Sequence, residues 1–106
     1  MPADSKEEIS HLVSYLETSG CEFYRNGSWH TGKDASAHLK KKYQYLLDKK
    51  LVSSADSFIE RAAKKSSMSG QPYMVRCDKL AAVESAAWFS AELARHRDRS
   101  DRAATK

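Results

Sequence analysis

The chain has 106 residues, which is room for one domain around a single hydrophobic core. Hydrophobic residues make up 41% of it and charged residues 30%, a balance that argues against intrinsic disorder. No apolar run approaches the ~18 residues of a membrane-spanning helix, so no membrane span is expected. A formal net charge of +4 is too small on its own to indicate a nucleic-acid partner.

The first predicted elements are a helix over 4–19, ended by Gly20, and a β-hairpin. The core face of this helix is predicted from apolar residues at helical spacing: Ile9, Leu12, Val13 and Leu16. Two short β-like segments, 21–25 and 28–30, flank an Asn-Gly pair at 26–27. This dipeptide is the one most favoured in two-residue hairpin turns, so the pattern predicts antiparallel pairing of the two segments.

Two more helices are predicted in the middle of the chain. Thr31 stands three residues before Asp34, an arrangement typical of a helix start, and the helix should reach about Asp48. A pair of serines at 53–54 precedes a third helix, expected over 55–66. Each of these helices carries an apolar face that needs a partner to cover it.

The remaining segments are a loop over 66–72, a strand over 73–77, a last helix over 85–97 and a tail over 98–106. The tail has no large apolar residue, and we therefore expect it to be disordered. The order of elements predicts an α+β domain over 1–97, in which about four helices pack on a small two- or three-stranded antiparallel sheet.

Cys21 and Cys77 are the only two cysteines, 56 positions apart, and both fall in predicted strands. They could form a disulfide, which would imply an oxidising compartment, or remain as two buried thiols. The residues after Met1 show neither the basic start nor the apolar stretch of a secretion signal. The protein is therefore expected to be either cytoplasmic or exported with its signal removed.

Several segments together resemble the YfeK-like family of small bacterial proteins of unknown function. They are SGCxFxRNG at 19–27, HLxxKYxYL at 38–46, SAxxFIxxA at 54–62, SSxSGxPYxVxC at 66–77, and Trp88 with Glu92-Leu93. The resemblance implies a periplasmic, exported protein in which both cysteines are kept. It implies no catalytic residue, substrate or cofactor.

The most basic segment is Lys40, Lys41 and Lys42, followed by Tyr-Gln-Tyr. Residues 35–65 hold 8 basic and 3 acidic side chains, so a surface for an anionic partner is conceivable. Consecutive helical residues are spread about 100° apart, however, and three of them do not form one stripe. The alternative is an ordinary solvated face, and the sequence shows no nucleic-acid-binding signature that would decide for nucleic acid.

A second candidate is the loop that contains Ser66, Ser67, Ser69 and Gly70, with Arg25 nearby in the predicted fold. Hydroxyls and backbone N–H groups beside a glycine can cradle an anion. The same composition is typical of a helix exit, in which serines hydrogen-bond the last helical carbonyls.

Trp29 and Trp88 are candidates for exposed interaction anchors, with core packing as the alternative. The four histidines stand singly, without the spacing of a metal site, so no metal or cofactor is expected. No set of nucleophile, base and stabiliser emerges, and no enzyme is expected.

These observations favour a non-enzymatic binding protein of the cell envelope, with an unidentified protein or an anionic envelope component as its partner. An inhibitor or immunity-type protein of an exported enzyme is the second expectation. A cytosolic nucleic-acid-binding protein, acting through the basic second helix, is the third.

Overall fold

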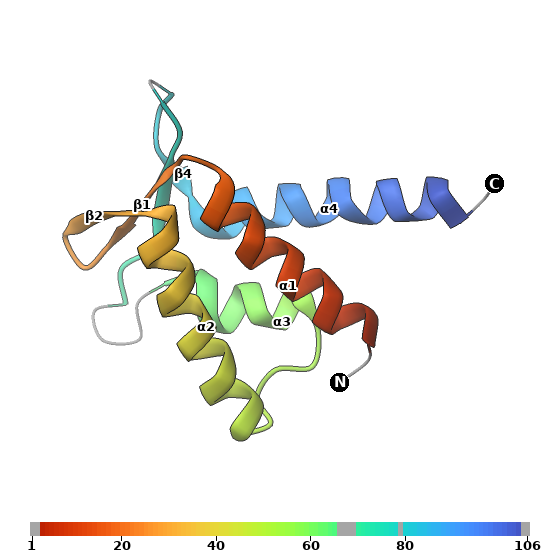
Figure 1. The fold of residues 1–106 in the computed structure, drawn as a ribbon. Coiled ribbons are helices and arrows are strands. Elements are labelled where there is room, and N and C mark those ends of the chain that lie inside the picture. The colour runs from red at the N-terminus through yellow and green to blue at the C-terminus, as the bar shows by residue number, and fades with distance from the viewer. Residues whose placement is uncertain (1–2, 66–69, 79, 105–106) are drawn as a thin grey trace.

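The computed structural model describes residues 3–65, 70–78 and 80–104 of the chain (Figure 1). The helices are α1 (Ala3–Thr18), α2 (Gly32–Asp48), α3 (Ala55–Phe58), which continues as the π-helical η1 (Ile59–Ala63), and α4 (Ser85–Ala104). The strands are β1 (Glu22–Arg25), β2 (Ser28–Thr31), β3 (Met74–Arg76) and β4 (Val83–Glu84). Helices packed beside one antiparallel sheet confirm the predicted α+β class.

The sheet has the strand order β2-β1-β3-β4, and every neighbouring pair is antiparallel. Phe23 of β1 pairs with His30 on one side and with Val75 on the other. This sheet has one strand more than the two or three expected. The additional strand, β4, has only two residues, and it forms because Val83 pairs with Val75 rather than because of any β-like sequence pattern.

The hairpin between β1 and β2 is formed as predicted from the Asn-Gly pair. Asn26 and Gly27 both have positive φ, 51° and 86°, which is the backbone that a tight hairpin turn requires. Four residue pairs then join the two strands, from Glu22 with Thr31 to Arg25 with Ser28.

The core lies between the helices and one face of the sheet. α2 contacts β1 and β2, and α4 contacts β3 and β4, so these two helices meet opposite halves of the sheet (Figure 1). The main core side chains are Ile9, Leu12, Val13, Leu16, Phe23, Leu39, Phe58, Tyr73, Val75, Phe89 and Leu93. The four α1 residues among them are those predicted from the helical spacing.

The start of α2 packs directly against the end of α1. The Thr31 side chain accepts a hydrogen bond of 3.1 Å from the backbone N–H of Asp34, which confirms the predicted N-cap. The next residue, Gly32, is buried, and a Cβ atom there would lie 2.3 Å from the carbonyl oxygen of Leu16. The two helices can approach this closely only because residue 32 has no side chain.

The third helix differs from the single α-helix expected over 55–66. Its start is capped as predicted, with the Ser54 side chain accepting from the backbone N–H of Ser57, but after Phe58 it widens into η1. The carbonyl groups at its end have partners elsewhere in the fold. The Ser85 hydroxyl donates to the carbonyl of Ala63, and the backbone N–H of Tyr73 donates to the carbonyl of Lys64.

The last helix continues past its expected end at residue 97 to Ala104, so the expectation of a disordered tail over 98–106 is wrong for the residues up to 104. Ion pairs lie around the point where the helix was expected to end. Arg97 contacts Glu8 of α1 at 2.8 Å and Asp56 of α3 at 3.0 Å, and Arg99 reaches back to Glu92 at 3.2 Å. None of the helices described in the structure has the length and hydropathy that a membrane crossing requires.

Candidate functional site

A pocket of about 360 Å³ lies between α2 and η1. It is lined by His38, Lys41, Lys42, Tyr45 and Leu46 of α2 and by Arg61 of η1. The spacing of His38, Lys41 and Tyr45 places these side chains on one face of the helix, because residues three and four apart are neighbours on a helix surface. The volume falls within the range of small-molecule sites, roughly 300–1,000 Å³.

Lys42 is held in place by the buried aromatic ring of Tyr73. Its Nζ donates a hydrogen bond of 3.1 Å to the Tyr73 hydroxyl and lies 5.0 Å from the centre of that ring. Burial, followed by the positive charge of Arg25, lowers the pKa of Lys42, and burial raises the pKa of Tyr73. The pocket therefore holds an ammonium group that has lost part of its hydration and has gained a neutral partner.

His38 is surrounded by positive charge. Burial, followed by the charges of Arg25, Lys42, His30 and Lys41 in that order, lowers its pKa from 6.5 to about 4. The imidazole is therefore neutral at pH 7. Arg25 does not line the pocket, but it lies close enough for its charge to act on both His38 and Lys42.

Among the residues that the structure describes, no carboxylate forms an ion pair with Arg25, Lys41, Lys42 or Arg61. Elsewhere on the surface, cations do form ion pairs with carboxylates, as Arg76 does with Glu22 at 2.9 Å. In the part of the chain that the structure describes, the positive charge of the pocket is thus not paired with an acid.

The structure separates the three consecutive lysines. Lys41 and Lys42 face the pocket, whereas Lys40 points to the other side of α2. There it forms an ion pair of 3.5 Å with Glu17 of α1 and borders a smaller recess of about 230 Å³ between α1 and α2. The lysine segment is therefore not one surface, as the helical spacing already indicated.

Arg61, Tyr45 and His38 belong to the site and were not among the candidates from sequence. The spacing of His38, Lys41, Lys42 and Tyr45 along α2 is a signal that could have grouped these four. Nothing in the sequence indicates that Arg61 lies beside them, because Arg61 belongs to another helix. It lies in the π-helical segment η1. Such turns recur at functional sites.

The predicted anion-binding loop lies mostly outside the described residues. Ser66, Ser67 and Ser69 fall in that gap, and the prediction for them stays a prediction. Gly70 is described as exposed, with a positive φ of 71°.

Both tryptophans are half-buried and already have partners. The guanidinium of Arg76 lies 3.9 Å from the centre of the Trp29 ring, and Tyr24 meets that ring edge-on. Trp88 stacks on Tyr15 at 4.8 Å and packs against the core. Neither ring stands free as an exposed anchor.

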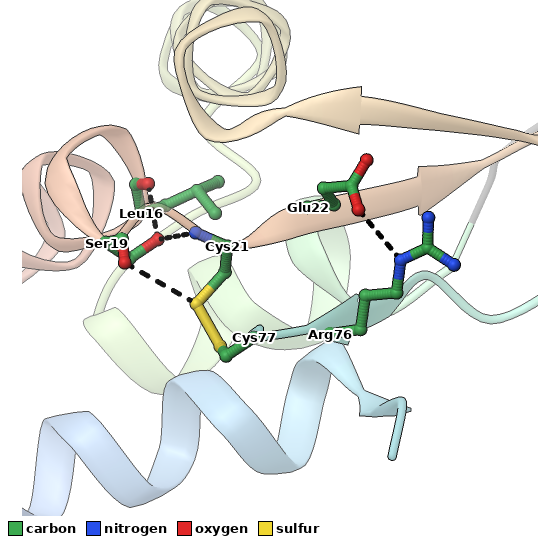
Figure 2. The surroundings of a disulfide bond; sticks show 6 residues. All are labelled: Leu16, Ser19, Cys21, Glu22, Arg76 and Cys77. Atoms are coloured by element: carbon green, nitrogen blue, oxygen red, sulfur yellow. Dashed lines mark hydrogen bonds and ion pairs between the residues drawn. A yellow bond between two sulfur atoms is a disulfide. The ribbon is translucent and has the colours of Figure 1, made fainter. Parts of the chain in front are cut away.

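Cys21 and Cys77 form a disulfide, one of the two states that the sequence left open (Figure 2). It joins the segment between α1 and β1 to the end of β3. The hydroxyl of Ser19 links the end of α1 to Cys21: it donates a hydrogen bond of 2.8 Å to the carbonyl of Leu16 and accepts one of 3.1 Å from the backbone N–H of Cys21. On the neighbouring residues, Glu22 and Arg76 form the ion pair that Figure 2 shows beside the bridge.

Fold and pocket together define a small disulfide-bonded α+β protein with a basic pocket on its second helix. No group of three or more histidine, cysteine or acidic residues in the described ranges is placed to hold a metal ion. The chain belongs to the family of unknown function DUF5329, which it matches over residues 3–97. Comparisons with curated proteins and with solved structures find no match.

Proposed function

We propose that this protein is a non-enzymatic, exported cell-envelope protein that binds an anionic partner through the pocket between α2 and η1. The observation that carries the proposal is the convergence of Lys41, Lys42 and Arg61 on one pocket, where none of them forms an ion pair with an acid of the described ranges. Uncompensated charge of one sign in a concave site attracts ligands of the opposite sign.

Two observations support export. The disulfide between Cys21 and Cys77 is a bond that persists in oxidising compartments such as the bacterial periplasm. The motifs around both cysteines, moreover, resemble those of the YfeK-like family, for which the periplasm is the implied compartment.

The chemistry of the pocket favours binding over catalysis. Histidine is the most frequent general base, but burial and neighbouring cations lower the pKa of His38, which lines the pocket, to about 4. An efficient base needs a pKa near the working pH, and this imidazole is too weak to take a proton at pH 7. A neutral His38 can still accept a hydrogen bond from a ligand.

The test compares charge reversals that change the net charge equally but differ in position. Lys41→Glu and Arg61→Glu remove pocket cations, and the matched control Lys33→Glu removes an exposed cation at the start of the same helix. Each variant carries a formal charge of +2 instead of +4. On a phosphate-bearing cation-exchange column, the two pocket variants should elute at lower salt than the control.

Elution of all three variants at the same salt concentration would contradict the proposal, because retention would then depend on net charge alone. Circular dichroism of each variant checks that the exposed substitutions leave the fold intact.

A further inference from the structure

The pocket is larger than a simple anion needs. Its volume of about 360 Å³ corresponds to about a dozen water molecules at roughly 30 Å³ each. A single phosphate or carboxylate group would fill only a small part of this space. A ligand that occupies the remainder must present other chemistry to the other walls.

Those other walls are apolar. Leu46 and Tyr45 both line the pocket; Leu46 is 7% exposed, and Tyr45 is 59% exposed. The ammonium of Lys49 lies 6.0 Å from the centre of this ring. Covering an exposed aromatic ring with an apolar group removes apolar surface from water and therefore lowers the free energy.

The cations and the apolar walls belong to the same face of α2. Lys41 and Lys42 precede Tyr45 by four and three residues, so charge and ring are neighbours on the helix surface. Arg61 of η1 closes the pocket from the opposite side. A ligand with an acidic head beside an apolar body matches this arrangement, because head and body would meet their partners at the same time.

We propose that the pocket binds a small amphipathic anion. Its carboxylate or phosphate head would be held by Lys41, Lys42 and Arg61, and its apolar body would lie against Tyr45 and Leu46. This inference rests on the proposed function and narrows it from anions in general to anions with an apolar part. It also assigns Tyr45 a role in specificity.

Three probes separate the two parts of the ligand: phenyl phosphate, inorganic phosphate and phenol. We expect calorimetric titration of the oxidised protein at pH 7 to give at least tenfold tighter binding of phenyl phosphate than of either of the other two. In Tyr45→Ser, the advantage of phenyl phosphate over inorganic phosphate should fall below threefold. Leu80→Ser is the matched control, since Leu80 is 73% exposed outside the pocket.

Equal affinity for phenyl phosphate and inorganic phosphate would overturn this inference and leave the proposed function standing. An unchanged preference in Tyr45→Ser would overturn the role of the ring. Absence of binding by both phosphates, together with equal elution of the charge-reversal variants, would overturn the proposed function as well.

Discussion

Opening the disulfide should cost this protein a large part of its stability. The bridge closes a loop between residues 56 positions apart, and the chain-entropy relation for a loop of this length gives about 4 kcal/mol at 25 °C. Small domains are stable by only about 5–15 kcal/mol in total. We therefore expect the reduced protein to be folded only marginally.

The measurement is urea denaturation followed by tryptophan fluorescence, with and without dithiothreitol. Reduction keeps both sulfur atoms in place, so the loss in the wild type reports the bridge itself rather than a change in packing. The double variant Cys21→Ala with Cys77→Ala should lose the same ~4 kcal/mol, plus up to about 1 kcal/mol for the small void left at the buried residue 21. Dithiothreitol should have no effect on this variant. A loss below about 1 kcal/mol on reduction of the wild type would refute the reasoning.

Three further predictions concern packing and charge. Gly32→Ala should destabilise the fold by about 1–3 kcal/mol in urea denaturation, because its Cβ would lie 2.3 Å from the backbone oxygen of Leu16; an unchanged midpoint would contradict this. The His38 ring should titrate by NMR with a pKa of about 4. As the pH falls below 6.5, the unfolded chain takes up the His38 proton before the folded protein does, so the free energy of unfolding decreases until about pH 4. His38→Gln should lessen that decrease. An NMR titration midpoint of the His38 ring above about pH 6 would show that burial and the cations do not act as described. Burial works to raise the pKa of Glu92, but hydrogen bonds from His11 and two arginines outweigh it and hold it below its ordinary value. Glu92→Gln should thus cost about 2 kcal/mol, against at most a few tenths for the exposed control Glu60→Gln, and equal losses in both variants would contradict the assignment.

The features that could be predicted from sequence depend on neighbours along the chain. The hairpin follows from the Asn-Gly pair, whose residues adopt positive φ, and the start of α2 follows from the spacing of Thr31 and Asp34. The core face of α1 follows from the helical spacing of its apolar residues, because an apolar helix face is buried regardless of which segment packs on it.

The features that could not be predicted depend on distant segments. β4 forms by the pairing of Val83 with Val75. α4 continues to Ala104, and Arg97, at its expected end, forms ion pairs with Glu8 and Asp56 of other helices. No local pattern contains these contacts.

The candidate site also combines residues that the sequence indicated with features that depend on distant segments. Lys41 and Lys42 were among the sequence candidates, and their separation from Lys40 follows from the helical angle. The pocket itself requires Arg61, which tertiary packing places opposite them. The low pKa of His38 likewise depends on burial and on Arg25 of β1, both of which are set by the fold.

Binding of an anion in the pocket between α2 and η1 can be observed residue by residue by NMR. Phenyl phosphate would be titrated into the isotopically labelled, oxidised protein at pH 7, and the backbone amide shifts would be followed. We expect the shifts to be concentrated at residues 38–46 of α2 and 59–63 of η1. Shifts spread evenly over cations away from the pocket, such as Lys33, Arg76 and Arg95, or no shifts at all, would contradict it.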